Sequence, residues 1–368
     1  MRTLKDMDLS GKKVLVRVDF NVPMEEGQIT DDERIRAALP TIKHLLKEDC
    51  PISLLSHLGN PKGRLVPELS LEPVARRLEE IFQEEGLELK LKVKTNVQLV
   101  GKKFIFESPR LAKAKLPKVA LLENLRFWWE EEENHEGFAH CLSGLGEVFV
   151  QEAFACCHRS HASIIGLPKY LPSYPGFLVE KEVSFLNKLL ASPPRPFVAI
   201  IGGKKVETKA KPIDKISEIA DLVIIGGLIE KEIKEKNIAL RFPHKIVGPL
   251  DENEGKDIGP ETIEFFKQKI ASARTVFWSG PMGAFEEEKY SQGTMEVARA
   301  VAQVSLSVVG GGDTTNAVKR AGVADKITYI STGGGATLKF LENGTLPGII
   351  ALEENKTWYD FLASLDLS

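Results

Sequence analysis

Cysteine is scarce in this chain. Four cysteines in 368 residues do not make a disulfide framework. A zinc site formed by Cys156 and Cys157 with His158 and His161 is also disfavoured, because adjacent cysteines close one tetrahedral site poorly and no second CxxC appears. The sequence therefore argues against a disulfide-stapled secreted domain and against a structural zinc module.

Long apolar runs are missing as well. No stretch reaches the roughly 18 apolar residues that a membrane helix needs. The first ten residues mix charged and apolar side chains and contain no apolar core of an export signal. We therefore expect a cytoplasmic protein without a membrane partner.

Neither sign of charge dominates. Lys and Arg number 49 against 52 Asp and Glu, a net charge of -3, which argues against a nucleic-acid binder that works by bulk positive charge. The acidic run Glu130–Glu133 is predicted to be the solvated face of a helix. At roughly 100–200 residues per domain, the length predicts two domains. We expect a monomer with no nucleic-acid partner.

Three nucleotide-binding fingerprints are absent. No GxxxxGK[ST] run occurs, which excludes a P-loop NTPase, and no GxGxxG occurs, which argues against a dinucleotide oxidoreductase on an α/β framework. The segment His158-Arg159-Ser160 has no Asp to make a protein-kinase catalytic loop. Any nucleotide must be held by a different arrangement.

Apolar, β-branched runs alternate with helix-periodic stretches along almost the whole chain. This alternation predicts parallel-sheet α/β architecture, and nine or so strands suit two sheets. The joining helix is predicted at Phe177–Leu190, because prolines bound it on both sides. The predicted strands are Lys13–Val18, Ile52–Ser56, Val119–Leu122, Val148–Val150, Phe197–Ile201, Leu222–Ile225, Thr275–Trp278, Leu306–Val309 and Ile327–Ile330. The other predicted helices include Arg34–Leu46, Leu71–Glu84, Glu261–Ala273, Thr294–Gln303 and Ala336–Leu341.

Glycine-rich turns follow four of the predicted strands in the second half. Without a Cβ, glycine lets backbone N–H groups approach an anion, and a helix behind the turn adds the positive end of its dipole. In an open α/β sheet such turns gather beyond the carboxyl ends of the strands, where ligands bind. One such turn is simply a tight turn, but four in one domain favour a phosphate site. The turns are Gly202-Gly203, Gly280–Gly283, Gly310–Gly312 and Gly333–Gly335.

Charged residues accompany two of these turns. Lys205 and Lys209 lie four apart, so a helix there would place both on one face. They either neutralise a polyphosphate or belong to a solvated, lysine-rich helix start. Asp313 follows the triple glycine, ahead of a helix expected from about Asn316, and it either holds Mg²⁺ or caps that helix.

In the first half, polar residues follow the predicted strands instead. Separately, each arginine there reads as a surface ion-pair partner. Together, Arg34, Arg126, Arg159 and His57 can clamp a small, highly anionic substrate through charge-assisted hydrogen bonds.

With these residues in place, the sequence resembles the phosphoglycerate kinase family nearly end to end. The motifs, in the family's order, are RVDFNVP (17–23), SHLG (56–59), ENLRF (123–127), HRSHAS (158–163), GPMGAFE (280–286), GGGDTT (310–315) and STGGGA (331–336). The resemblance implies reversible, Mg²⁺-dependent phosphoryl transfer between ATP and 3-phosphoglycerate, giving ADP and 1,3-bisphosphoglycerate, in glycolysis and gluconeogenesis. It implies a fold of two doubly wound parallel-sheet, Rossmann-like α/β domains joined by a helix and hinge. These are a 3-phosphoglycerate-binding domain at residues 1–172 with the tail at about 346–368, and a nucleotide-binding domain at 173–345, with closure about the hinge.

The resemblance also implies roles for individual residues. The substrate-binding set is Asp19, Phe20, Asn21, Arg34, His57, Leu58, Gly59, Asn60, Arg126 and Arg159. The nucleotide-binding set is Lys209, Glu286, Gly311, Gly312, Asp313 and Thr314, with Asp313 reaching the metal. The set facing the phosphoryl group in flight is Arg34, Lys205, Gly333 and Gly334. Because the acceptor is already a carboxylate, the chemistry needs positioning and charge neutralisation, and no general base.

The sequence departs from the family's pattern in places. Asn60 stands where the family has an arginine after SHLG, and Arg64 lies four residues further on as a candidate substitute. Gln151-Glu152 replace an Asn-Asp pair, and Ser279 replaces an Asn. Only about 30 residues separate Gly227 from Asp257, where the family has a longer segment that helps to form the nucleoside pocket. A second hypothesis is therefore a non-catalytic descendant that binds phosphoglycerate and has a degraded nucleotide site.

Overall fold

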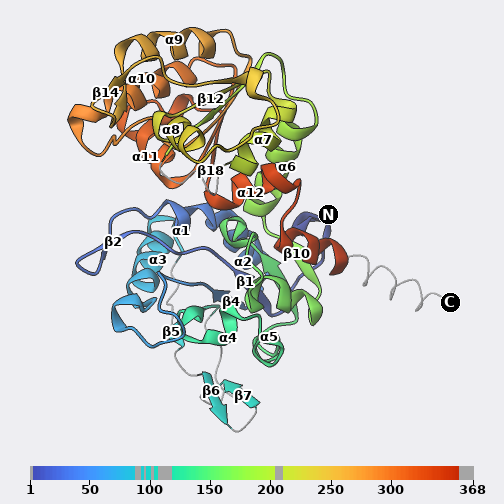
Figure 1. Cartoon of the computed structure of the whole chain (residues 1–368). Helices are drawn as coiled ribbons and strands as arrows, with labels where there is room; N and C mark the ends of the chain where they lie inside the picture. Colours follow the sequence, from blue (N-terminus) through green and yellow to red (C-terminus); the bar gives the residue numbers. More distant parts are fainter. Residues whose placement is uncertain are drawn as a thin grey trace, which may run out of the picture. The chain divides into compact units, whose positions relative to one another are not determined.

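The chain builds two separate parallel sheets. The structure, a computed structural model, describes residues 3–87, 93–94, 97–100, 103–106, 118–203 and 210–355 (Figure 1). It divides into two units, Met1–Val183 with Leu346–Ser368, and Ser184–Thr345. Each unit contains one six-stranded sheet. The expected fold class, two doubly wound α/β domains, is confirmed.

The sheet of the first unit has the order β10-β9-β1-β4-β8-β5 and is parallel throughout. From β1 the sheet continues through β4 to β8, with β5 at the edge, and on the other side of β1 lie β9 and then β10. The order therefore reverses between β1 and β9, the position in such sheets where ligands bind beyond the carboxyl ends of the strands. The strands are β1 (Val14–Arg17), β4 (Ile52–Leu55), β5 (Val93–Lys94), β8 (Val119–Leu122), β9 (Val148–Gln151) and β10 (Ser173–Pro175).

Helices cover both faces of this first sheet. Alternate strand residues such as Val16 and Leu54 pack under one set of helices, and Leu15 and Leu55 pack on the opposite face against α5. The helices are α1 (Glu33–Ala37), α2 (Leu39–Lys47), α3 (Glu72–Glu84), α4 (Trp129–Glu132) and α5 (Glu136–Ser143). Two hairpins, β2–β3 (Met24–Glu25, Gln28–Ile29) and β6–β7 (Val97–Val100, Lys103–Phe106), stand apart from the sheet.

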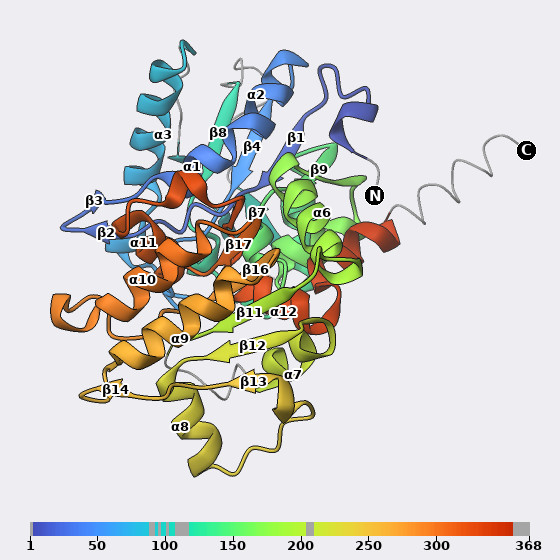
Figure 2. The same cartoon turned by 90° about the horizontal axis from the view of Figure 1, so that it is seen from above.

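The sheet of the second unit has the order β13-β12-β11-β16-β17-β18 and is also parallel (Figure 2). Here the order reverses between β11 and β16. The strands are β11 (Phe197–Ile201), β12 (Leu222–Ile225), β13 (Ile246–Val247), β16 (Thr275–Ser279), β17 (Leu306–Gly310) and β18 (Tyr329–Ser331). The helices are α7 (Ala210–Ile219), α8 (Gly227–Glu235), α9 (Pro260–Ala271), α10 (Gln292–Val301), α11 (Gly312–Arg320) and α12 (Gly335–Asn343). A short pair, β14 (Glu252–Asn253) and β15 (Asp257–Ile258), completes the unit.

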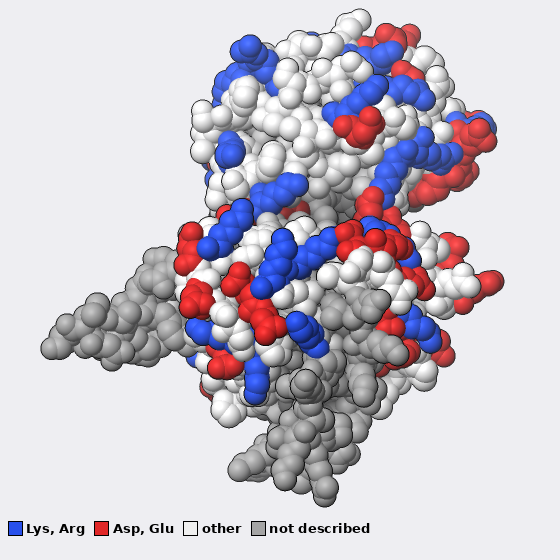
Figure 3. Space-filling view, turned by 180° about the vertical axis from the view of Figure 1, so that it is seen from behind, with Lys and Arg blue, Asp and Glu red and all other residues white. Residues whose placement is uncertain are grey.

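No helix among the described residues combines the length and the apolar character needed to span a bilayer. Acidic and basic side chains are intermixed over the face in Figure 3, in keeping with the net charge of -3.

The predicted strands are all present, with ends within two residues of those expected. Two helix predictions are wrong in detail. The segment 34–46 is two helices, α1 and α2, because Pro40 has no N–H to continue the ladder. Helix α11 begins at Gly312 instead of about Asn316, directly after Gly311 reverses the chain with φ +104°.

The prediction that the acidic run Glu130–Glu133 is the solvated face of a helix is wrong for its first two residues. Glu130 and Glu131 of α4 are buried, with 5% and 0% of their surface exposed. The Glu131 carboxylate accepts hydrogen bonds from the backbone N–H and the hydroxyl of Ser163, at 2.9 and 2.5 Å. The run faces inward at this point because the single-turn helix η5 (Ala162–Gly166) brings donors to it.

The joining helix α6 (Phe177–Ala191) crosses the division between the units and is anchored in the first. Phe177 N–H donates to the Thr41 hydroxyl at 2.9 Å, and Leu178 N–H donates to the Glu152 carboxylate at 3.2 Å. Gly176 is required here, since a Cβ at that position would lie 1.8 Å from Glu152 Oε2. Glu152 therefore fixes the beginning of α6 against the loop that follows β9.

The returning segment also belongs to the first unit. A helix covers residues 347–355, and Gly348 N–H donates to Cys157 O at 2.9 Å. The Asn355 side chain accepts from Ser173 N–H at 2.8 Å and donates to Leu171 O at 2.9 Å. Residues 356–368 of the expected tail lie outside the described part.

Glu152→Gln tests the buried anchor of α6. Burial raises the pKa of Glu152 well above its usual value of 4.5, although hydrogen bonds from Thr41 and Leu178 lower it. The folded state therefore holds this proton more tightly than the unfolded chain, so its stabilisation is present at low pH and is lost as pH rises above 4.5. When the pH is raised from 5 to 8, the difference in Tm between Glu152→Gln and the parent should therefore shift in favour of the variant by at least about 2 °C.

Asp32→Asn provides a control of opposite sign. Burial raises the pKa of Asp32, but hydrogen bonds from Arg77 and Arg36 outweigh it and lower the pKa below 3.8. The stabilisation from Asp32 is therefore present at neutral pH and is lost in acid. As pH rises, the Tm of Asp32→Asn should fall further below that of the parent. A pH-independent difference between Glu152→Gln and the parent would contradict the raised pKa.

Candidate active site

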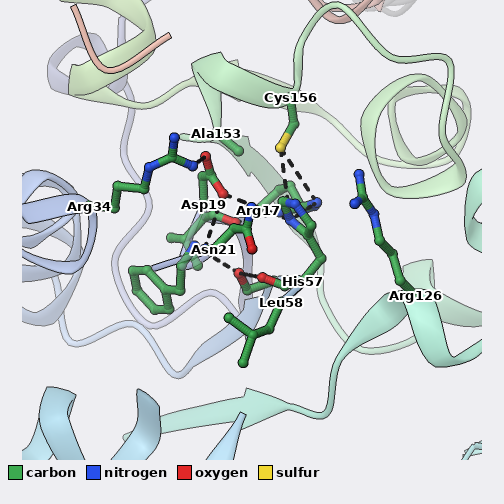
Figure 4. A network of polar contacts seen from close by, with 12 residues as sticks. Arg17, Asp19, Asn21, Arg34, His57, Leu58, Arg126, Ala153 and Cys156 are labelled. Carbon is green, nitrogen blue, oxygen red and sulfur yellow. Dashed lines mark hydrogen bonds and ion pairs between the residues drawn. The ribbon is translucent and has the colours of Figure 1, made fainter. Parts of the chain in front are cut away.

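Polar residues from three strand ends converge at the reversal point of the first sheet. Asp19 follows β1, His57 follows β4, and Cys156 lies in the turn η4 (Phe154–Cys156) after β9. His57 Nδ1 lies 3.8 Å from Asp19 Oδ1 and 4.0 Å from Cys156 Sγ. Arg34 of α1 donates to Asp19 Oδ2 at 2.5 Å. Figure 4 shows Asp19 between Arg34 and Arg17, with His57 and Cys156 beside Arg17.

Arg17 is the residue that sequence reasoning missed. It is the last residue of β1, and only 1% of its surface is exposed. Its guanidinium donates to Val18 O and, at 2.8 Å, to the Ser163 hydroxyl, and Nη2 lies 3.3 Å from His57 Nδ1. The available signal was an arginine inside an otherwise apolar strand, since a charge buried there must be compensated by partners from elsewhere.

Hydrogen bonds tie together the loops that carry the predicted substrate residues. Phe20 is buried, and its N–H donates to the Ser56 hydroxyl at 2.9 Å. Asn21 Oδ1 accepts from Gly59 N–H at 2.8 Å, and Gly59 takes φ +61°. Gly59 O in turn accepts from Arg126 Nη1 at 2.9 Å.

The Asn124 side chain holds the same loop from a third direction. It donates to Leu58 O at 2.7 Å and to Leu69 O at 2.9 Å. Asn60 and Arg64 both lie exposed. The structure therefore brings the loops after β1, β4 and β8 together, while Asn60 and Arg64 face solvent.

Two arginines of the predicted clamp retain donors for a ligand. Arg126 lies largely buried, and its Nε makes no hydrogen bond among the described residues, although Glu132 Oε1 is 3.4 Å away. Burial lowers the pKa of Arg126. Arg159 is exposed and forms no ion pair within the described part of the chain. Both can donate to an anion without breaking a strong internal pair.

His57 is a neutral member of this neighbourhood. Burial lowers its pKa well below 6.5, and the positive charges of Arg17, Arg126 and Arg34 lower it further. Burial and the positive charges of Arg126, Arg17 and Arg159 lower the pKa of His161 to about 3. The cations of the pocket at neutral pH are therefore guanidinium groups, and His57 contributes a neutral hydrogen bond.

The cluster of Asp19, His57 and Cys156 does not fit a metal ion. Their ligand atoms lie within 4.8 Å of one another in the described chain. However, Arg17 Nη2 lies 3.3 Å from His57 Nδ1 and 3.9 Å from Cys156 Sγ, so a cation already occupies this position. Burial also raises the pKa of Cys156 to about 11, which keeps it a thiol instead of the thiolate that binds metals.

In the second unit, glycine turns close the reversal point of the sheet. Gly202 N–H donates to Ser279 O at 2.9 Å, and Gly203 N–H donates to Pro281 O at 2.8 Å. A Cβ at Gly202 would lie 2.2 Å from Pro281 O, so the turns after β11 and β16 approach too closely for any other residue.

Two of the glycine turns open helices with free N-termini. Gly311 precedes α11 and Gly334 precedes α12, with φ +104° and +53°, and neither helix has a side-chain cap. Gly333 lies beside Gly334, and its own N–H donates to the Ser331 hydroxyl at 3.1 Å. Uncapped N–H groups at two adjacent strand ends form an arrangement that suits phosphate oxygens.

Asp313 lies exposed in the first turn of α11. Of its two alternatives, helix capping is wrong, because the N-cap residue is Gly311. The Thr314 hydroxyl accepts from Gly280 N–H at 2.7 Å, which joins this turn to the one after β16. Glu286 is exposed. Lys205 and Lys209 lie outside the described residues.

Comparisons with known proteins identify the family. A family model described as phosphoglycerate kinase matches residues 4–239 and 230–344. The chain is 44% identical to the phosphoglycerate kinase of Moorella thermoacetica, covering 96% of this chain and 99% of that protein, and 42% identical to that of Pelotomaculum thermopropionicum, covering 95% and 98%.

Solved structures agree. The chain superposes on the phosphoglycerate kinase of Pyrococcus horikoshii with a TM-score of 0.82 at 31% identity, covering 97% of this chain and all of that one. The enzyme of Coxiella burnetii gives a TM-score of 0.77 at 32% identity, covering 96% and 99%.

The same comparisons mark where this chain is shorter. The alignment with the Moorella relative runs over 398 positions, more than the 368 residues present here, so that relative carries segments that this chain lacks. The family match breaks into two pieces that meet at residues 230–239, in and just after α8. This break falls within the segment after Gly227 that we expect to be shortened. Because the family match covers both units on either side of this break, the chain belongs to the phosphoglycerate kinase family.

Proposed function

We propose that the chain is an active phosphoglycerate kinase that transfers a phosphoryl group reversibly between ATP and 3-phosphoglycerate in glycolysis and gluconeogenesis. The observation that carries this is the near-complete coverage of both halves by relatives named as this kinase, at 40–44% identity. It favours the kinase over the non-catalytic alternative. We propose the cytoplasm as its location and a monomer as its working form.

The first unit, Met1–Val183 with Leu346–Ser368, contains the proposed 3-phosphoglycerate domain, residues 1–172 with the returning tail. Arg34, Arg126 and Arg159 supply guanidinium donors, which suit the planar carboxylate and the phosphate of this substrate. Asp19, Asn21 and His57 complete the pocket with neutral and acidic hydrogen-bonding groups. The exposed guanidinium of Arg159, which forms no ion pair within the described part of the chain, supports this assignment.

Residues 173–345 form the proposed nucleotide domain. The uncapped starts of α11 and α12 offer backbone N–H groups to the phosphates, with Thr314 holding the turns together and Lys209 and Glu286 completing the set. The exposed carboxylate of Asp313 fits Mg²⁺, which binds through one or two carboxylates together with substrate phosphates. When bound, Mg²⁺ neutralises charge on the phosphates.

The reaction needs no base from the protein, because the acceptor is a carboxylate. We propose that closure about α6 brings the two substrates together, and that Arg34, Lys205 and the Gly333-Gly334 turn neutralise the charge of the phosphoryl group in transit. In this mechanism the enzyme lowers the barrier by positioning and electrostatics alone.

A coupled assay with 3-phosphoglycerate and MgATP tests the function directly. The purified chain should turn over, and a folded sample with no turnover at millimolar substrates would reject the proposal. Calorimetry separates the alternative, which predicts binding of 3-phosphoglycerate without binding of MgADP.

Lys205→Ala tests the charge proposed at the moving phosphate. Loss of one oriented charge should lower kcat by about 10²–10³-fold, with a much smaller effect on the affinity for 3-phosphoglycerate. Lys211→Ala, an exposed lysine in α7, is the matched control and should retain kcat. Equal losses of turnover and of 3-phosphoglycerate affinity in Lys205→Ala would contradict the role.

Gly311→Ala tests the turn that opens α11. At φ +104° a side chain is strained, at a cost of about 1–3 kcal/mol, so the turn should shift and MgATP should bind at least about tenfold more weakly. Gly322→Ala, at φ +68° beyond the other end of α11 and with open space around its added Cβ, carries comparable backbone strain away from the site. Both variants should lose Tm, but calorimetry should find weaker MgATP binding only in Gly311→Ala. Equal MgATP affinities in the two variants would exclude this turn from the nucleotide site.

A further inference from the structure

A buried polar chain lies behind the substrate pocket and has no part in the mechanism above. It runs from Glu131 of α4 through Ser163 of η5 to Arg17 of β1. The exposed fractions of the three residues are 0%, 0% and 1%. Ser163 Oγ lies 2.5 Å from Glu131 Oε1 and 2.8 Å from Arg17 Nε. Three segments far apart in the sequence thus meet in one solvent-excluded contact.

The direction of each hydrogen bond follows from the donors present. A guanidinium can only donate, so Ser163 Oγ accepts from Arg17 Nε and its own proton goes to Glu131 Oε1. Ser163 N–H donates to the second carboxylate oxygen, Oε2, at 2.9 Å. This pattern suits an ionised Glu131. Burial raises the pKa of Glu131 above its usual value, and the charge of Arg17 and the bonds from Ser163 offset only part of that rise, so the assignment of an ionised Glu131 rests on these donors.

The charged and titratable groups around the chain are few. His161 Nδ1 lies 3.8 Å from Glu131 Oε1, and its pKa of about 3 leaves it neutral. Glu131 is therefore the anion that compensates buried Arg17 through Ser163. Since Arg17 is bonded at Nε and at Nη1, its plane is fixed, and the direction in which Nη2 points is fixed with it.

That direction decides the tautomer of His57. Nη2 of Arg17 lies 3.3 Å from His57 Nδ1, so this nitrogen must accept and the ring proton must sit on Nε2. Cys156, a protonated thiol 4.0 Å away, is also a donor toward Nδ1. The carboxylate oxygen Asp19 Oδ1 is 3.8 Å from Nδ1, which is beyond hydrogen-bond distance.

We propose that Glu131 and Ser163 are positioning residues that act through Arg17 to hold His57 as the Nε2–H tautomer, so that the ring offers an N–H donor to the anionic substrate. This inference rests on the proposed function for the identity of the substrate. The part played by each residue is orientation, and neither touches the reacting atoms.

Nitrogen NMR of histidine-labelled protein tests the tautomer, with the His57 signals assigned by loss in His57→Gln. In the parent chain, Nδ1 should have the shift of an unprotonated ring nitrogen and Nε2 that of a protonated one. This measurement requires no substitution at Glu131, Ser163 or Arg17, and it does not depend on whether the protein turns over substrate. An Nδ1–H tautomer in the parent would overturn the inference by itself.

Ser163→Ala removes the bridge and frees Arg17 Nε. The His57 signals should move toward a mixture of tautomers, and the KM for 3-phosphoglycerate should rise about tenfold with a smaller change in kcat and none in the KM for MgATP. Ser163→Thr keeps the hydroxyl and should restore both readouts. Glu130→Gln, a buried glutamate one position away on α4, is the matched control and should leave both unchanged.

The outcomes separate this inference from the proposed function. If Ser163→Ala lowers the Tm but leaves the His57 tautomer and the KM for 3-phosphoglycerate unchanged, the polar chain behind the pocket has only a structural role. That result would overturn the inference. An inactive parent with the Nε2–H tautomer would reject the proposed function alone, and the change of tautomer in Ser163→Ala would still support the positioning role.

Discussion

A single buried guanidinium at the end of β1 is the constraint on which the first unit's site depends. Arg17 lies where the strand order reverses, with 1% of its surface exposed, and a cation cannot remain there unless its donors are satisfied. Its partners come from the carbonyl of Val18, from η5 through Ser163, and from the loop after β4 through His57. Satisfying one charge therefore requires β1, β4, α4 and the segment after β9 to be in place together.

The two units offer anions different chemistry on the same kind of scaffold. In the first, side-chain guanidinium groups such as Arg34 and Arg126 provide charge and directional donors. In the second, the donors are backbone N–H groups at the starts of α11 and α12, and the glycines before them allow a close approach. The first site thus depends on burial and internal pairing, because those set the orientation of long side chains. The second depends on backbone conformation at Gly311 and Gly334.

The strands were readable from the sequence because parallel strands buried on both faces are continuous apolar runs. The glycine turns were readable because their spacing after strands has a physical cause. The orientation of Glu131 was not readable, since an acidic run looks the same whether it faces water or the donors of η5. Arg17 was missed for a related reason: its partner Ser163 is 146 residues away, and no local pattern reports such a contact.

The shortened segment after Gly227 is compatible with phosphate binding because of where it falls in the sheet. It follows β12, which lies with β13 on one side of the reversal point between β11 and β16. The turns that open α11 and α12 follow β17 and β18, on the other side. The missing residues are therefore separated in the sheet order from the helix starts proposed for the phosphates. A chain without these residues keeps the backbone donors proposed for the phosphates. The side of the sheet that is altered, after β12, is the one that the family resemblance assigns to the nucleoside.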